Sequence, residues 1–271
     1  MSPTYVLGHS ERELERLATQ AALVNPMTRR YFAQAGVAAG MRVLDVGCGP
    51  GDVSILVADM VGPKGEVVGV DRSPVALATA RARIQERSLS QVSFREGDPG
   101  QMTFDRPFDA VVGRYVLMFQ TDPAVLVRGV AQHLKPGGIL VFHEVDWDGV
   151  ASKPPAPIHD QCCRWICEVL DRTGHDKNMG KRLHKTYIAA GLPPPSMDVS
   201  ALIGGGVKNV EELNLIVGLM ETMLPAMEAA GVTTSAEVGL ETLADRMIRE
   251  AANSESVIMG RFEVGAWTRK E

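Results

Sequence analysis

Three carboxylates and a glycine-rich turn are the residues whose types and spacing could bind a polar ligand. Asp45 lies in a short apolar run, and the turn Gly47-Cys48-Gly49-Pro50-Gly51 follows directly. Asp71 ends a second apolar run about 20 residues later, and Asp98 follows a third. Carboxylates accept hydrogen bonds from ammonium, hydroxyl and amine groups, and glycines let a ligand approach the backbone. The pattern predicts a ligand site at the carboxyl ends of buried parallel strands.

The glycine spacing separates two classes of nucleotide site. The turn reads GxGxG, whereas the dinucleotide fingerprint GxGxxG needs a small residue where Asp52 stands. An acid at the start of the following helix would repel a pyrophosphate. The sequence therefore favours a nucleoside with a neutral or cationic tail. An enzyme that uses a nicotinamide cofactor is the weaker alternative, and titration with fluorescent NADH would distinguish the two.

Five segments in order resemble the motifs of class I S-adenosylmethionine-dependent methyltransferases, in particular the small-molecule enzymes of ubiquinone and menaquinone biosynthesis. These segments are Val43–Gly51, Val67–Ser73, Arg95–Asp98, Phe108–Gly113 and Leu134–Gly138. The resemblance covers about residues 40–147 and the last strand. It implies S-adenosyl-L-methionine as cofactor and S-adenosyl-L-homocysteine as product.

The resemblance assigns the first two segments to the amino-acid and ribose parts of the cofactor. Asp45 would serve the loop backbone or the cofactor ammonium, and Gly47 and Gly49 would make backbone contacts. Asp71 would accept from both ribose hydroxyls. Arg72 could place its guanidinium over the adenine ring or point to solvent.

The third segment departs from the family pattern. Asp98 resembles the acid that accepts from the adenine amine, but Pro99 has no backbone N–H for an adenine ring nitrogen. Either Gly100, Gln101 or Met102 supplies this contact, or the adenine lies in a slightly different place.

Four further positions are candidates. The Gly113 carbonyl could accept from the cofactor amino group. Arg114 could bind the cofactor carboxylate, anchor an acidic substrate or hold the N-terminal lid. Gln20 resembles lid positions that close over the cofactor, or belongs to an ordinary polar helix face. His143 is the best-placed general base, because its usual pKa lies near neutral pH, although such a histidine is more often structural.

The order of apolar runs and helical patterns predicts an α/β fold. We expect a Rossmann-like, doubly wound, seven-stranded sheet, mostly parallel with an antiparallel last strand, and helical cap insertions. The leading helix should end at Asn25-Pro26, with a second short helix over 28–34. We expect a single domain over 1–271, with a core at about 37–148, 181–206 and 256–271. Lid or cap elements should cover 1–36, 149–180 and 207–254.

Composition limits the partners and the compartment. The net charge is −5, with 28 basic and 33 acidic residues and no basic tail, so a nucleic-acid partner is disfavoured. Cys162, Cys163 and Cys167 have no metal-ligand spacing, so we expect helix-packing thiols and no metal. No apolar run is long enough to span a membrane and no signal peptide is visible. These features favour a cytoplasmic protein.

These observations predict an enzyme that transfers a methyl group to a small organic acceptor by in-line displacement. The acceptor would be an O, N or C nucleophile in a hydrophobic pocket. A non-catalytic S-adenosylmethionine-binding assembly or regulatory protein is the alternative. The apolar helices within 207–254 could close over the site or form a homodimer interface.

Overall fold

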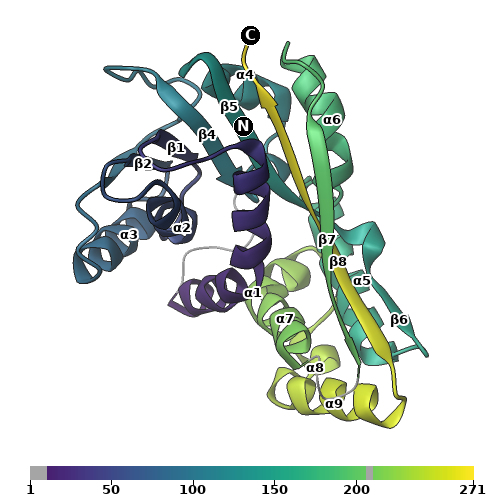
Figure 1. Cartoon of the computed structure of the whole chain (residues 1–271). Helices are drawn as coiled ribbons and strands as arrows, with labels where there is room; N and C mark the ends of the chain where they lie inside the picture. The colour runs from purple at the N-terminus through teal and green to yellow at the C-terminus, as the bar shows by residue number, and fades with distance from the viewer. Residues whose placement is uncertain (1–10, 206–209) are drawn as a thin grey trace. The chain divides into compact units, whose positions relative to one another are not determined.

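The strands form one eight-stranded sheet in the computed structural model, which describes residues 11–205 and 210–271 (Figure 1). Its order is β3-β2-β1-β4-β5-β8-β6, and β7 pairs with β8. The strands are β1 (Arg42–Val46), β2 (Glu66–Asp71), β3 (Val92–Glu96), β4 (Phe108–Arg114), β5 (Leu134–Asp146), β6 (Ala151–Lys153), β7 (Ser196–Gly205) and β8 (Val257–Arg269).

The predicted Rossmann-like α/β class is confirmed, with one strand more than expected. Strands β1 to β5 run parallel to one another, whereas β6 pairs antiparallel with β8. The extra strand is β6, whose three residues follow a short 3₁₀ helix, η2 (Trp147–Gly149). A strand of three residues is too short for alternation to reveal it in the sequence.

Three α-helices and a short 3₁₀ helix lie between β1 and β5. They are α2 (Asp52–Val61), α3 (Pro74–Glu86), η1 (Leu117–Phe119) and α4 (Pro123–Ala131). Ser73 and Asp122 cap α3 and α4 by accepting from backbone N–H groups, and a proline follows each cap. The later helices are α5 (Pro157–Arg172), α6 (Met179–Ala189), α7 (Val210–Ala229), α8 (Ser235–Val238) and α9 (Leu240–Asn253).

The chain forms two compact units. One unit contains residues 24–144, 179–199 and 264–271, and the other contains 1–23, 145–178 and 200–263. We call them the sheet unit and the helical unit. Helix α1 (Glu11–Ala35) and the strands β5, β7 and β8 contribute residues to both. Most residues that the sequence assigns to lid and cap elements belong to the helical unit.

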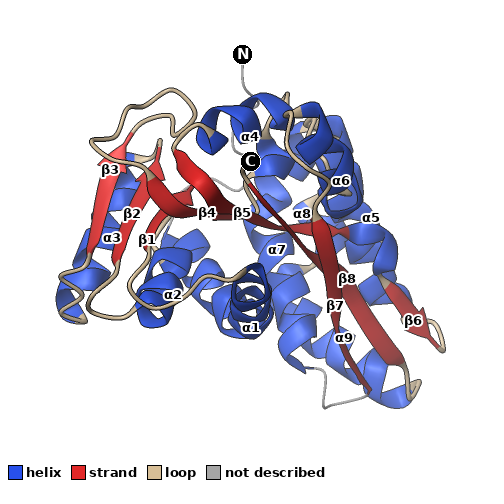
Figure 2. Cartoon of the chain, turned by 45° about the horizontal axis from the view of Figure 1, so that its top comes forward, coloured by secondary structure: helices blue, strands red, loops and turns tan. Residues whose placement is uncertain are grey.

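The core of the sheet unit lies between β1–β3 and the two helices that follow β1 and β2. Figure 2 shows α2 and α3 beside these strands. Helix α2 buries most of its length against them, including Leu56 and Val57, and α3 contributes Leu77 and Ala80. Burial of side chains of this size stabilises a fold by about 1.5–3 kcal/mol each.

One predicted break is wrong: α1 continues through Pro26 to Ala35. Proline removes one helical hydrogen bond, but side-chain contacts stabilise this part of the helix. Arg114 donates to Asn25 Oδ1 at 2.8 Å and to Thr28 Oγ1 at 3.0 Å. Tyr31 and Phe32, one turn further on, are fully buried. The sequence does not reveal contacts between positions so far apart.

The helical unit contains the methionines that the sequence groups together. Met220, Met223, Met227 and Met247 are almost completely buried, and α7 packs against α5 and α9. They therefore form part of the core of this unit. Helices α8 and α9 are separated at Gly239, whose φ of 58° ends the first of them. Homodimer formation through 207–254 stays a prediction.

A test of the core uses Gly69, which faces Phe94 on the neighbouring strand. A Cβ there would lie 2.6 Å from Phe94 Cδ1 and 2.9 Å from Ser54 Oγ. We expect Gly69→Ala to lower the free energy of unfolding by about 1–3 kcal/mol, since the ring and the hydroxyl must both move.

Urea unfolding of both variants checks this, with Gly205→Ala as the matched control. A Cβ at Gly205 would meet its nearest atoms at 3.7 and 3.8 Å, an ordinary contact distance. Equal stability of the two variants would contradict the packing described for Gly69.

Candidate functional site

The candidate site lies at the carboxyl ends of neighbouring parallel strands in the sheet unit. The register pairs Val46 of β1 with Val70 of β2 and with Gly113 of β4. The residues that follow these strands therefore come together at one edge of the sheet, as ligand-binding loops do in open α/β sheets. Most of the predicted cofactor-binding residues, from Asp45 to Arg114, belong to this edge or to the turn after β3.

Asp45 is a carboxylate buried in the middle of the sheet. It is 1% exposed, and its Oδ2 accepts from Ser54 Oγ at 2.6 Å. Its Oδ1 is buried and has no hydrogen-bond partner within the described residues. Burial raises the pKa of Asp45 from 3.8 to about 7, while the Ser54 hydroxyl and the Arg114 guanidinium act in the opposite direction. A buried, unpartnered carboxylate oxygen fits a cationic donor such as an ammonium group.

Asp71 connects the glycine turn to the end of β2. Its Oδ2 accepts from Gly49 N at 2.9 Å, and its Oδ1 accepts from Ser73 N at 2.8 Å. Gly49 has a φ of 52°, and a Cβ there would meet no atom within 4 Å. The turn therefore presents open space beside a carboxylate that still has acceptor capacity on both oxygens. Such acceptors are what the two hydroxyl groups of a ribose diol require.

The turn after β3 holds Asp98 in a dense set of hydrogen bonds. Asp98 Oδ2 accepts from Arg72 Nη2 at 2.7 Å and from Gln101 Nε2 at 2.9 Å. Arg72 thus bonds to Asp98, which neither alternative of the sequence analysis anticipated. Pro99 contributes its carbonyl, which lies 2.9 Å from His133 Nε2. The roles of Arg72, Asp98 and Pro99 toward adenine stay predictions.

Gly113 and Arg114 lie inside β4, near its end, rather than after it. A Cβ at Gly113 would lie 2.5 Å from Phe142 Cε1, so the glycine allows β4 and β5 to pack closely. Arg114 donates to Asn25 and Thr28 on α1. Of the three roles weighed for Arg114, these contacts support the one that holds the N-terminal helix.

His143 lies inside the sheet unit, against α1. It is fully buried, and its Nδ1 lies 3.0 Å from Thr28 Oγ1. The ring centroids of Tyr31 and Tyr115 lie 5.0 and 5.4 Å from that of His143. These contacts support the structural alternative, because a packed imidazole orients its neighbours rather than a substrate. A general-base role for His143 stays a prediction.

Gln20 belongs to the helical unit by the division of the chain and is 6% exposed. It is therefore no ordinary exposed polar residue. A contact of Gln20 with the cofactor stays a prediction.

Two further residues of the sheet unit support the turns of the candidate site, although the sequence analysis did not single them out. Glu144, buried in β5, accepts from the N–H groups of Val116 and Leu117 at 2.8 and 2.7 Å. It thereby holds the turn after β4, where Tyr115 adopts a φ of 55°. An acid inside the apolar run of β5 was the signal available for Glu144.

The second residue is Arg83, which donates to Asp52 Oδ1 and to Pro50 O, both at 2.7 Å. Because Arg83 compensates the charge of Asp52, the repulsion of a pyrophosphate is weaker than the sequence suggests. The missing third glycine remains the stronger argument against a dinucleotide.

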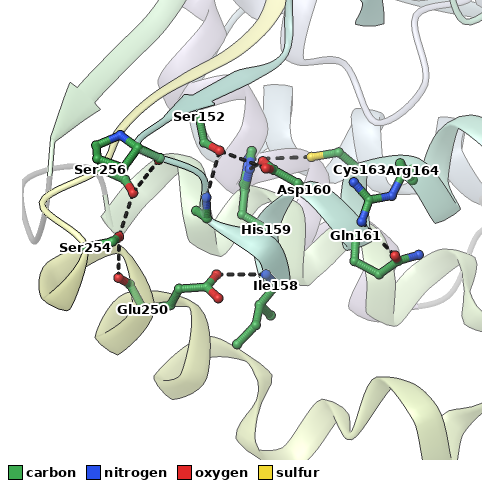
Figure 3. A network of polar contacts seen from close by, with 12 residues as sticks. Ser152, Ile158, His159, Asp160, Gln161, Cys163, Arg164, Glu250, Ser254 and Ser256 are labelled. Carbon is green, nitrogen blue, oxygen red and sulfur yellow. Dashed lines mark hydrogen bonds and ion pairs between the residues drawn. The ribbon is translucent and has the colours of Figure 1, made fainter.

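In the helical unit, α5 carries a thiol, an imidazole and a carboxylate that contact one another in this order (Figure 3). Cys163 Sγ lies 3.5 Å from His159 Nε2, and His159 Nδ1 lies 3.1 Å from Asp160 Oδ1. Nucleophilic cysteine enzymes use this order of groups. Here burial raises the pKa of the Cys163 thiol well above its usual value, and the carboxylate of Asp160 adds to that effect. The thiol therefore stays protonated, and these three side chains have a packing role in α5.

The described residues contain no group of three or more His, Cys, Asp or Glu side chains that could hold a metal ion. Within the same part of the chain, no helix combines the length and the apolar composition that crossing a membrane requires.

Residues 38–191 match the methyltransferase domain family, so the chain belongs to this family. It is 30% identical over 198 residues to a 2-phytyl-1,4-naphthoquinone methyltransferase of Synechococcus elongatus, covering 68% of this chain and 78% of the relative. It is 32% identical over 123 residues to a demethylmenaquinone methyltransferase of Lactococcus lactis, covering 45% of this chain.

The match spans only 46% of the Lactococcus relative. Among solved structures, the YcgJ protein of Bacillus subtilis aligns with a TM-score of 0.56 and 17% identity, covering 92% of this chain and 99% of that one. This likeness supports the fold.

The buried carboxylate gives a testable pH dependence of stability. The pKa of Asp45 is about 7 in the folded protein and 3.8 as its usual value. Between these values the folded state holds a proton that the unfolded chain has released, so the free energy of unfolding falls as pH rises from about 4 to 7. We expect the free energy of unfolding of Asp45→Asn not to fall in this way. The variant should therefore become more stable relative to the native protein as pH rises from about 4 to 7.

Urea unfolding between pH 4.5 and 8.5 measures the difference between the two proteins. Ser54→Ala is the companion variant: removing the hydroxyl that lowers the pKa should extend the window above pH 7. A difference between Asp45→Asn and the native protein that does not change with pH would show that Asp45 is ionised throughout.

Proposed function

We propose that this chain is an S-adenosylmethionine-dependent methyltransferase that acts on a small organic acceptor. The observation that carries the proposal is the buried Asp45 Oδ1, which has no hydrogen-bond partner within the described residues. Asp45 lies in β1 one residue before its carboxyl end, and open α/β sheets bind ligands at that end. Burying a carboxylate without a partner is costly. An ammonium group of a bound ligand would compensate this cost, and the cofactor carries one at its amino-acid end.

The remaining residues fit the rest of the cofactor. Asp71 can accept from a ribose diol while its bonds to Gly49 and Ser73 keep it in place. The open space at Gly49 admits the ligand at the backbone. Asp98 lies beside Arg72, in the turn that corresponds to the adenine segment of the family.

The proposed methyl transfer requires few catalytic groups from the protein. When bound, the cofactor supplies a methyl group on a positively charged sulfur, which a nucleophile can attack in line. Asp45 and Asp71 would fix the cofactor, and Glu144 keeps the turn after β4 in one conformation. Alignment of two reactants can provide about 7–11 kcal/mol of the barrier. A base is needed only for an acceptor that keeps its proton at neutral pH.

The names of the relatives indicate which acceptors to test first. Both are named after the methylation of naphthoquinones that carry an isoprenoid chain. A reduced naphthoquinone with such a chain is large and apolar and provides a carbon nucleophile on the ring. We propose this class as the first acceptor to be tested, and simpler phenols and amines as the next.

The cofactor assignment predicts binding of S-adenosyl-L-homocysteine and its loss on mutation. We expect isothermal titration to show micromolar binding to the native protein. Asp71→Ala should weaken it by about 100-fold or more, because it removes a charged acceptor and releases the turn at Gly49. Asp122→Ala, which removes only the cap of α4, should bind normally. Near-normal affinity of Asp71→Ala would contradict the assignment of Asp71 to the ribose hydroxyls.

Turnover separates the enzyme from a non-catalytic binding protein. We expect the native protein to increase the mass of a suitable acceptor by one methyl group in the presence of S-adenosyl-L-methionine, and to release S-adenosyl-L-homocysteine in equal amount. A matched reaction with Asp71→Ala should show neither. Tight cofactor binding without turnover on quinol, phenol and amine acceptors would instead support the regulatory alternative.

A further inference from the structure

The backbone N–H groups that follow Asp98 in the turn after β3 are all directed back at Asp98. Pro99 has no N–H, and Gly100 N donates to Asp98 Oδ1 at 3.0 Å. The N–H groups of Gln101 and Met102 both donate to the Asp98 carbonyl at 3.0 Å. All three backbone donors that the sequence analysis considered for an adenine ring nitrogen are thus directed at Asp98. A ligand that needs a donor from the residues after Asp98 must therefore find it on a side chain.

The Gln101 side chain places such a donor next to an acceptor. Its Nε2 donates to Asp98 Oδ2 at 2.9 Å, and the amide nitrogen carries a second hydrogen. Of the four acceptor positions of the Asp98 carboxylate, Gly100, Arg72 and Gln101 occupy three. One acceptor position and one amide hydrogen therefore remain side by side. Gln101 is also exposed, so its amide can turn toward a ligand without disturbing the core.

We propose that Gln101 is a specificity-determining residue that donates to the adenine ring nitrogen N1, while Asp98 accepts from the adjacent amine. The base edge of adenine presents a donor beside an acceptor, and this pair of side chains presents the complement. The inference rests on the proposed function, because it assumes that the ligand is S-adenosylmethionine or its product. It assigns to a side chain the contact that the backbone N–H groups after Asp98 cannot make.

Discrimination between two bases tests this assignment by binding alone. S-adenosylhomocysteine presents N1 as an acceptor, whereas S-inosylhomocysteine, its hypoxanthine analogue, presents N1–H as a donor and an oxygen in place of the amine. A site built to hydrogen-bond one of them leaves polar groups unpaired with the other. We expect isothermal titration to show that the native protein prefers the adenine compound by tenfold or more.

Two substitutions at Gln101 should change this preference in a defined way. Gln101→Ala should weaken S-adenosylhomocysteine by about tenfold, since one hydrogen bond is lost, and leave S-inosylhomocysteine within about twofold. Gln101→Glu places an acceptor opposite N1. It should weaken the adenine compound further and strengthen the hypoxanthine compound.

Gln132→Ala, an exposed glutamine at the end of α4, is the matched control and should behave as the native protein does. Arg72→Ala tests the other donor beside Asp98 and should weaken both ligands by a similar factor. An unchanged preference in both Gln101 variants, or loss of the preference in Arg72→Ala alone, would overturn the assignment. If the native protein bound neither compound, the proposed function itself would fail. Circular dichroism spectra of the variants confirm that each is folded.

Discussion

The buried carboxylate of Asp45 is the constraint on which the candidate site depends. A charge in the middle of a parallel sheet costs free energy unless it is paired, and only one of its oxygens has a partner within the described residues, the Ser54 hydroxyl. A valine at this position would stabilise the fold more simply, as Val43 and Val46 do on the same strand. Proteins keep such unfavourable groups where a ligand compensates them. The surrounding structure serves this arrangement: Gly69 leaves room for Ser54 and Phe94 beside it.

Asp71, at the end of the neighbouring strand β2, fixes the glycine turn. It converts an open glycine turn into a defined one, because a single carboxylate accepts from Gly49 and Ser73 together. The parallel register then sets the distance between Asp45 and Asp71 without further side chains. Since the backbone determines most of this geometry, a short sequence motif is enough to specify it. This explains why the turn and the two carboxylates at this end of the sheet can be located from the sequence.

Features that depend on distant contacts could not be predicted in the same way. The starts of α3 and α4 follow from the sequence, since Ser73 and Asp122 act locally as caps. By contrast, the continuation of α1 through Pro26 depends on Arg114, which lies 89 positions from Asn25. The compensation of Asp52 by Arg83 likewise needs two helices to meet. In the turn after β3, the sequence shows that Pro99 lacks an N–H but not where the other N–H groups point.

His143 and Glu144 show why residues with a proposed catalytic role are harder to predict from the sequence. In the sequence, a titratable imidazole near the end of a strand is a reasonable candidate base. In the structure, however, Thr28 and Tyr31 surround the imidazole, while the adjacent carboxylate determines the conformation of the turn after β4. Methyl transfer needs alignment more than proton transfer. A turn held by Glu144 can therefore contribute to catalysis without any side chain that a search for acids and bases would find.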